Sequence, residues 1–142
     1  FLQGCPLRCG YCHNPETRDA SGGKTATVKD IMEKVLRCRN YFGKNGGITV
    51  SGGEPLMQAK FVTELFKECK RQGINTCLDT SGCIMNDDVT ELLRVTDLCM
   101  LDIKMTNDED YREYIVHSFL NGRSSAKVTL SGFFVCCTIN RT

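Results

Sequence analysis

Apolar residues recur at helical spacing in several segments of the first 116 residues, which predicts amphipathic helices. Thr27, Asn86 and Asn107 each precede such a segment, and all three are residue types that commonly cap a helix. The remaining segment begins near Phe61 and ends before Gly73. We therefore expect helices that start near residues 28, 61, 87 and 108, the first of them ending near residue 40.

Short β-rich runs alternate with these helices and predict strands over residues 48–50, 74–78 and 98–103. Residues 1–3 read as the end of a strand whose beginning is missing, so we infer a fragment. Strands that alternate with helices predict a parallel sheet with crossover helices. The expected fold class is therefore α/β, with a barrel-like parallel sheet.

Polar and glycine-containing motifs follow the predicted strands. They occupy residues 5–12, 51–54, 79–82 and 102–104. Because the carboxyl ends of parallel strands meet at one face of such a sheet, these motifs are expected to form one site.

Residues 117–142 differ in character from the part before them. Residues 117–125 are polar and irregular, and the β-prone runs 128–130 and 133–137 have no helix between them. We assign residues 1–116 to a core domain and residues 117–142 to a tail. The tail is either a divergent end or foreign sequence from a shifted reading frame, and both interpretations remain open.

Composition and charge bear on whether the protein binds nucleic acid or a membrane. The chain has 142 residues, a net charge of +1 and 25% charged residues, with lysine and arginine spread along it. No basic stripe indicates nucleic acid, and no apolar run reaches the length of a membrane span. Neither partner is therefore expected.

Ten cysteines in 142 residues would indicate a disulfide framework in a secreted protein. Their distribution favours another interpretation, because several lie in apolar helix or strand patterns and are expected to be small buried residues: Cys38, Cys69, Cys77 and Cys99. This distribution predicts a reducing, cytoplasmic location.

The remaining signal is the spacing C-x3-C-x2-C formed by Cys5, Cys9 and Cys12. Three thiolates in one loop can hold three irons of a cubane cluster and leave the fourth iron open, whereas electron-transfer clusters use four cysteines. The alternatives are buried thiols or a zinc site with His13 as fourth ligand. Structural zinc sites usually bring ligands from two knuckles, and no second C-x2-C occurs here.

With Tyr11 between the second and third cysteines, the motif resembles the signature of the radical S-adenosylmethionine (SAM) enzymes. The continuation over residues 13–17 resembles the activases of glycyl radical enzymes, in particular those of pyruvate formate-lyase. The resemblance runs from Phe1 to about Val116. It implies a partial (β/α) barrel of the radical SAM type, truncated at both ends, that binds a 4Fe-4S cluster and SAM.

The resemblance also implies SAM contacts. Tyr11, Cys12 and His13 would face the adenine, although a tyrosine ring more often simply packs. Residues 51–55 resemble the family's Gly-Gly-Glu motif, which meets the amino group of SAM, although Gly-Gly and Pro also mark ordinary turns. The matching residues are Gly52, Gly53 and Glu54, whose carboxylate would complement an ammonium. Asp102 is also among the implied SAM contacts. Lys104 is either a solvated strand end or a partner for a SAM carboxylate or ribose oxygen.

A monovalent cation beside SAM is a further implication of the resemblance. The matching positions here are Asp79, Thr80, Met100 and Asp102. Oxygen ligands suit a hard cation. The alternative interpretation is that each aspartate only caps the helix that follows its strand.

The implied reaction is reductive cleavage of SAM followed by abstraction of hydrogen from a glycine of pyruvate formate-lyase, with flavodoxin or ferredoxin as electron donor. No catalytic side-chain acid or base is required. Between Cys12 and Ser51 only Cys38 occurs, which leaves no ligand set for the ferredoxin-like insert of other activases. Two alternatives remain open: a radical SAM enzyme with another substrate, and a non-catalytic cluster- or metal-binding fragment.

Overall fold

The computed structural model describes residues 1–115 and 135–138, and its centre is a parallel sheet. The strands β1 (Gly47–Val50), β2 (Asn75–Thr80) and β3 (Leu98–Leu101) lie side by side in that order. Gly47 pairs with Asn75, and Cys77 pairs with Leu98. The predicted α/β class and parallel strands are therefore confirmed, although β2 continues two residues further than expected and β3 ends two residues earlier.

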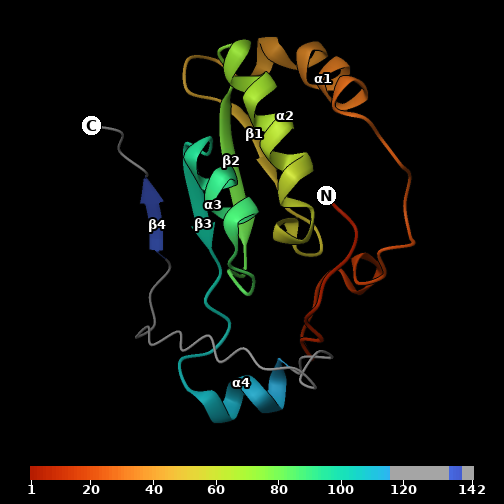
Figure 1. The fold of residues 1–142 in the computed structure, drawn as a ribbon, viewed down its shortest axis with the longest axis vertical. Coiled ribbons are helices and arrows are strands. Elements are labelled where there is room, and N and C mark those ends of the chain that lie inside the picture. Colours follow the sequence, from red (N-terminus) through yellow and green to blue (C-terminus); the bar gives the residue numbers. More distant parts are fainter. Residues whose placement is uncertain (116–134, 139–142) are drawn as a thin grey trace.

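A fourth strand, β4 (Val135–Thr138), pairs antiparallel with the outer edge of β3. It overlaps the β-prone run predicted over residues 133–137, whereas the run at 128–130 lies outside the described residues. Figure 1 shows β4 beside β3 and pointing in the opposite direction. The sequence predicted the strand but gave no direction for it.

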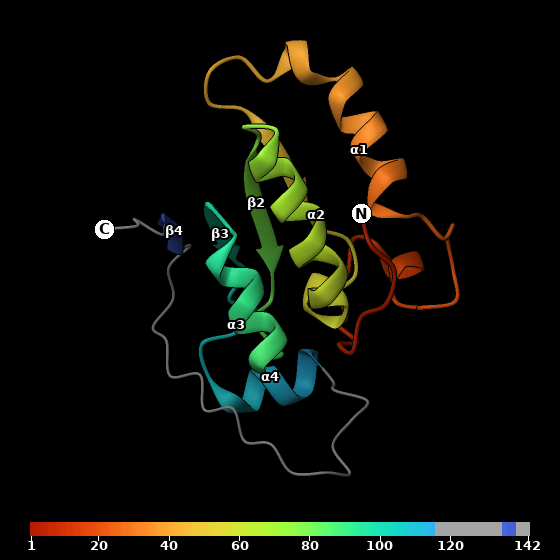
Figure 2. The same ribbon diagram turned by 45° about the horizontal axis from the view of Figure 1, so that its top comes forward.

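Helices α1 (Val28–Arg37), α2 (Ala59–Arg71) and α3 (Asp87–Arg94) follow the pattern of crossover connections. Helix α2 contacts β2 and lies between α1 and α3, so these helices gather on one side of the sheet (Figures 1 and 2). Phe66 and Val62 of α2 are fully buried in this layer with Leu78 of β2 and Leu92 of α3. This arrangement matches one sector of a barrel wall, with helices outside and strands inside.

The predicted caps are confirmed. Thr27 and Asp30 form a reciprocal capping box, in which the Thr27 Oγ1 accepts from the Asp30 N–H and the Asp30 carboxylate accepts from the Thr27 N–H. Asn86 caps α3, and Asn107 caps α4 (Asp108–Tyr114). No helix within the described ranges is long and apolar enough to cross a membrane.

Helix α1 ends earlier than predicted, at Arg37, and a short 3-10 helix (Arg39–Tyr41) follows it. Cys38 therefore lies past the last helical turn and is exposed, so the prediction that it is buried was wrong. Cys69, on the apolar face of α2, is fully buried as expected. Cys77 and Cys99 lie on strands and are half-buried, because the sheet covers them only in part.

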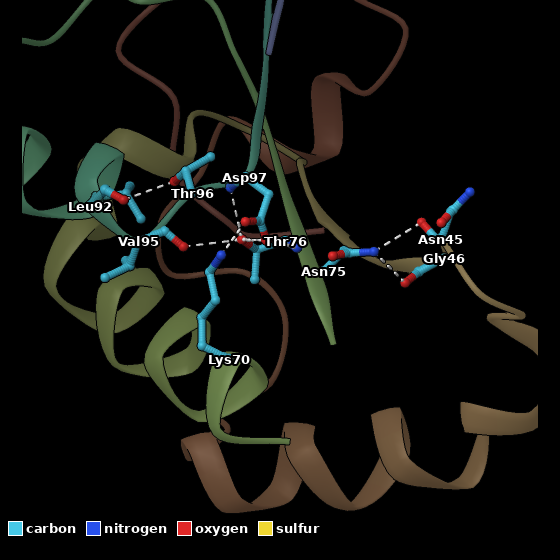
Figure 3. A network of polar contacts seen from close by, with 9 residues as sticks. All are labelled: Asn45, Gly46, Lys70, Asn75, Thr76, Leu92, Val95, Thr96 and Asp97. Atoms are coloured by element: carbon cyan, nitrogen blue, oxygen red, sulfur yellow. Dashed lines mark hydrogen bonds and ion pairs between the residues drawn. The ribbon is translucent and has the colours of Figure 1, made fainter. Parts of the chain in front are cut away.

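A polar network ties the amino end of β2 to the loop before β3 (Figure 3). The Asp97 carboxylate accepts from the Thr76 N–H at 2.9 Å and pairs with the Lys70 ammonium of α2. The Thr76 hydroxyl, which is almost fully buried, donates to the Val95 carbonyl at 3.1 Å. These contacts lie at the end of the sheet opposite the polar motifs and serve the fold.

Candidate functional site

The cysteine loop is fastened to the end of β1 by backbone hydrogen bonds. Leu2 forms a parallel bridge with Gly52, and the Leu2 N–H donates to the Ser51 carbonyl at 2.8 Å. The Glu54 N–H donates to the Gly4 carbonyl at 2.8 Å. Residues 1–3 were expected to form the end of a strand. In the structure they form a single parallel bridge, at Leu2, rather than a longer strand. The N-terminal segment, red in Figure 1, thus begins near the carboxyl end of β1.

Close backbone approach explains both glycines after β1. Gly52 has φ of +126°, and a Cβ there would lie 2.2 Å from the Leu2 nitrogen. A Cβ on Gly53 would lie 2.2 Å from the Gly4 carbonyl oxygen. Neither position can carry a side chain without moving the cysteine loop, so Gly-Gly is more than a turn signal here.

The polar motifs converge on one cavity of about 360 Å³, as their places after the strands predicted. Its volume lies within the range of about 300–1,000 Å³ that is usual for ligand pockets. The predicted site residues that line it are Cys5, Cys9, Tyr11, Cys12, His13, Gly52, Gly53, Glu54, Asp79, Thr80, Asp102 and Lys104. Met100 is the exception, because it does not line the cavity and is partly exposed on β3.

A second hollow, of about 540 Å³, lies against the same loop and is larger. It is lined by Cys5, Arg8 and Met57 but by neither Cys9 nor Cys12. The smaller cavity is therefore the one that matches the predicted chemistry.

The thiols of the loop form one donor set. Cys9 is buried, and Cys5 and Cys12 are half-buried. Burial raises the pKa of the Cys5 thiol. Burial also raises the pKa of the Cys9 thiol, although the nearby Lys104 ammonium acts in the opposite direction. A bound metal group would supply the positive charge that holds such thiols as thiolates.

The sequence left a single zinc ion open as an alternative to a cluster. Within residues 1–115 and 135–138, no three His, Cys, Asp or Glu side chains converge as ligands of one metal ion. In a cubane each thiolate binds a different iron, so the sulfur atoms stand further apart. The geometry therefore gives no support to a zinc site in which His13 is the fourth ligand.

Glu54 is buried and serves as an acceptor for protein groups. Its Oε1 accepts from the Thr80 hydroxyl at 2.5 Å and from the Leu56 N–H at 3.1 Å. Its Oε2 accepts from the Ser81 N–H at 3.0 Å and from the Ser81 hydroxyl at 2.5 Å. Sequence reasoning expected this carboxylate to complement an ammonium, whereas in the structure it joins β1 to the end of β2.

Lys104 and Asp102, both predicted to face SAM, form an ion pair with each other. Burial alone would lower the pKa of Lys104, but the hydrogen bond to Asp102 and its negative charge raise it. The Tyr11 hydroxyl donates to the Lys104 carbonyl at 3.3 Å. Lys104 is therefore a charged, half-buried group of the cavity wall, and its ammonium already has a carboxylate partner.

The expected cation ligands are brought together only in part. Asp79 of β2 pairs in register with Met100 of β3, and the Asp102 N–H donates to the Thr80 carbonyl at 2.9 Å. The Asp79 carboxylate accepts from the Ser51 hydroxyl at 2.8 Å. Because the Thr80 hydroxyl is already bonded to Glu54, it would have to leave that partner to bind an ion.

The far side of the loop is closed by the end of α4. The Gly10 N–H donates to the Tyr114 carbonyl at 2.9 Å, and Ile115 is fully buried against Leu7 and Cys9. In Figure 1, α4 lies at the same end of the molecule as the cysteine loop. A second small core thus supports the loop.

Comparison with known proteins identifies the fold family. The model of the Radical SAM superfamily matches residues 1–134 of the chain. The chain belongs to the radical SAM superfamily. Within this superfamily it is 49% identical over 118 residues to pyruvate formate-lyase 1-activating enzyme of Escherichia coli K12, an alignment that covers 81% of the chain and 48% of that enzyme.

Two further relatives are described as pyruvate formate-lyase-activating enzymes. The pyruvate formate-lyase-activating enzyme of Clostridium pasteurianum is 47% identical over 113 residues, which is 79% of this chain and 47% of that enzyme. The pyruvate formate-lyase-activating enzyme of Staphylococcus aureus USA300 is 46% identical over 121 residues. That alignment covers 79% of this chain and 48% of that enzyme. The chain thus spans about half the length of the curated relatives that it matches, and the predicted family resemblance is confirmed.

Two solved structures show a similar fold. Streptococcus suis SuiB bound to precursor peptide SuiA superposes with a TM-score of 0.63 at 19% identity, over 82% of this chain and 26% of that one. SuiB bound to S-adenosylmethionine superposes with a TM-score of 0.57 at 18% identity, over 82% of this chain and 25% of that one. At such identities the likeness concerns the fold alone.

Several residues at or beside this cavity carry no recognisable signal in the sequence. Ser51 and Ser81 fix the carboxylates of Asp79 and Glu54. Cys83 packs against the small core around Cys9, and burial raises the pKa of its thiol to about 11. Arg18 lines the same cavity as the cysteines. Their types and spacing are ordinary for loops, so only the tertiary structure identifies them.

Proposed function

We propose that the protein is an activating enzyme of a glycyl radical enzyme, most specifically of pyruvate formate-lyase. The observation that carries the proposal is the cavity in which Cys5, Cys9 and Cys12 meet the glycines after β1. The identity of 49% to a named activating enzyme supports the choice of substrate. Because the chain spans about half of that relative, the proposal concerns the whole protein.

In this proposal Cys5, Cys9 and Cys12 hold a 4Fe-4S cluster that, with bound SAM, supplies reductive cleavage of SAM and removal of a hydrogen atom from the partner's glycine. The backbone of Gly52 and Gly53 would border SAM, because both glycines line the cavity. Tyr11, Cys12 and His13 form the wall proposed to face the adenine. Lys104 and Asp102 contribute a paired charge to the rim.

Glu54 holds the end of β2 in place through Thr80 and Ser81, and so keeps the walls of the cavity together. We further propose that a monovalent cation is held by the oxygen atoms of Asp79 and Asp102 with Thr80 and Met100. The Thr80 and Met100 ligands have the least support, because one is bonded elsewhere and the other lies outside the cavity.

The remaining elements of the proposal follow from the family and from the composition of the chain. The electron donor is flavodoxin or ferredoxin, and the protein is cytoplasmic, with neither nucleic acid nor a membrane as partner. Residues 1–116 form the radical SAM core and residues 117–142 a separate tail, although the family match extends to residue 134.

Anaerobic reconstitution with iron and sulfide tests the proposal. The 142-residue chain is expected to bind one four-iron cluster, and its electron paramagnetic resonance signal after reduction is expected to change when SAM is added. Cys9→Ala should abolish cluster binding, whereas Cys38→Ala, at an exposed cysteine outside the cavity, should not. Binding of a single zinc ion without a cluster would favour the metal-binding alternative.

The substrate needs a separate measurement. The cluster-loaded protein, mixed with SAM, a reductant and pyruvate formate-lyase, should generate a glycyl radical that electron paramagnetic resonance detects. Cys9→Ala should give no radical. A cluster that responds to SAM but forms no radical on pyruvate formate-lyase, even in the full-length protein, would favour a radical SAM enzyme with another substrate.

A further inference from the structure

Arg18 is joined to two of the three cysteines through its backbone and its side chain. It follows the 3-10 helix Pro15–Thr17, and its carbonyl accepts from the Cys5 N–H at 3.2 Å. Its Nη2 donates to the Cys9 carbonyl at 2.5 Å. Arg18 therefore fixes the distance between the first and second cysteine of the loop from outside the motif.

The guanidinium of Arg18 keeps an unused donor. Its Nε–H is buried and has no hydrogen-bond partner among the described residues. A buried N–H without an acceptor is destabilising, so such a group calls for an acceptor, which can be water, an ion or a ligand. Arg18 lines the cavity together with Cys5 and Cys9, and thiolate and sulfide sulfur atoms of a cluster are acceptors.

The positive charge of the Arg18 guanidinium is also not paired with a carboxylate among the described residues. Within residues 1–115 and 135–138, no carboxylate lies within ion-pair distance of Arg18, whereas Lys104 is paired with Asp102. The other charged side chains of the cavity are carboxylates, those of Glu54, Asp79 and Asp102. Reduction adds one negative charge to a cluster, and a nearby cation in a partly buried site stabilises the added charge.

We propose that Arg18 is a positioning residue for the cluster, which holds the cysteine loop in shape, balances the charge of the reduced cluster and offers it the Nε–H donor. The proposal rests on the proposed function, because it requires that the three cysteines bind a cluster. It predicts that Arg18 raises the reduction potential, which makes the cluster easier to reduce.

The test compares reduction potentials of the reconstituted chain, measured anaerobically by titration with dithionite and followed by electron paramagnetic resonance. Arg18→Gln is expected to shift the one-electron reduction equilibrium about tenfold toward the oxidised cluster, which corresponds to a potential about 59 mV lower. Arg18→Lys keeps the charge and is expected to recover more than half of that shift.

Arg8 supplies the matched control. Its guanidinium also donates to carbonyls of the loop, those of Cys5 at 3.0 Å and Leu7 at 3.2 Å, but the side chain is exposed. Because solvent screens its charge, Arg8→Gln is expected to shift the equilibrium less than about threefold. An Arg18→Gln shift no larger than that of Arg8→Gln would overturn the proposal.

Iron content and circular dichroism cover the case in which Arg18→Gln does not retain a cluster. A folded Arg18→Gln chain without iron, beside an Arg18→Lys chain with iron, would support the charge role. Loss of iron from both variants would overturn it and leave Arg18 a structural clamp. Absence of a SAM-responsive cluster from the unsubstituted chain would instead contradict the proposed function.

Discussion

The hydroxyl of Thr80 donates to the Glu54 carboxylate at 2.5 Å, and both side chains are almost fully buried. The two residues belong to different strand ends, 26 positions apart in the sequence. Their contact joins the motif after β1 to the end of β2, at the wall of the cavity. Glu54 therefore has a structural role that its place in the motif does not reveal.

Glu54→Gln is expected to destabilise the chain. The carboxylate accepts from backbone N–H and hydroxyl groups through both oxygens, but an amide has one acceptor, and its NH2 group would face the Ser81 N–H. A buried donor left without an acceptor costs about 1–3 kcal/mol. Urea unfolding measures the change, with Glu33→Gln at an exposed position of α1 as control. Equal stability of the two variants would contradict the structural role.

Gly53→Ala is expected to displace the cysteine loop. The new Cβ would lie 2.2 Å from the Gly4 carbonyl oxygen and 2.7 Å from the Thr17 carbonyl oxygen. Both are backbone atoms, so neither can rotate away. We expect a loss of about 3 kcal/mol in the free energy of unfolding and a several-fold drop in iron bound on reconstitution.

Gly43→Ala is the control for Gly53→Ala. Gly43 has φ of +58°, but no atom lies within 4 Å of an added Cβ. The substitution should cost only the backbone strain of a left-handed conformation, about 1–2 kcal/mol, and leave iron binding unchanged. If Gly43→Ala lowered iron binding as much as Gly53→Ala, the close approach at Gly53 would not be the cause.

Local signals made much of this fold predictable. A cap such as Thr27 needs only the N–H groups within its own turn, and the sequence alone contains that information. The convergence of the polar motifs was also predictable, because parallel strands place their carboxyl ends together. The spacing of Cys5, Cys9 and Cys12 was visible in the sequence, and all three residues line the cavity in the structure.

Long-range partners could not be predicted. The bonds of Glu54 to Thr80, and of Arg18 to Cys9, depend on how separate loops meet in space. Cys38 was wrongly predicted to be buried, because helix periodicity does not specify where the last turn ends. Helix α1 ends at Arg37, so Cys38 no longer lies on its apolar face. No residue pattern specified the direction of β4.

Asp97→Asn is expected to reduce stability in a pH-dependent manner. Burial alone would raise the pKa of Asp97, but hydrogen bonds from Lys70 and Thr76 lower it below its usual value. A carboxylate with a lowered pKa stabilises the fold above its unfolded pKa of about 3.9, and the contribution is lost as the pH falls through the folded pKa. The side chain is 36% exposed, so after solvent screening we expect about 1 kcal/mol.

Urea unfolding between about pH 7 and pH 3 tests this expectation. The difference between the unsubstituted chain and Asp97→Asn should be largest near neutral pH and should shrink toward pH 3. Asp88, in a looser pair with Lys60 at 3.6 Å, provides the control, since Asp88→Asn should change stability little at either pH. A constant difference for Asp97→Asn would show that shape rather than charge matters there.

Lys104→Gln is expected to weaken SAM binding. Removing the ammonium leaves the Asp102 carboxylate unpaired at the rim of the cavity, where it would repel a ligand carboxylate. We expect a loss of about tenfold in affinity, or about 1.4 kcal/mol, measured by calorimetric titration of SAM into the cluster-loaded chain. Lys60→Gln, at an exposed lysine outside the cavity, should bind SAM as the unsubstituted chain does.

The proposed cation predicts that SAM binding depends on the salt present. When tetramethylammonium replaces sodium and potassium, the unsubstituted chain should bind SAM more weakly, by about tenfold, because a large organic cation cannot take close oxygen ligands. Asp79→Asn should bind weakly in either salt. Ser51→Ala removes the hydroxyl that donates to Asp79 but keeps the carboxylate, so its dependence on sodium or potassium should persist. Equal SAM affinity of the unsubstituted chain in both salts would exclude the cation from SAM binding, and Asp79 would then serve only to hold Ser51 at the end of β1.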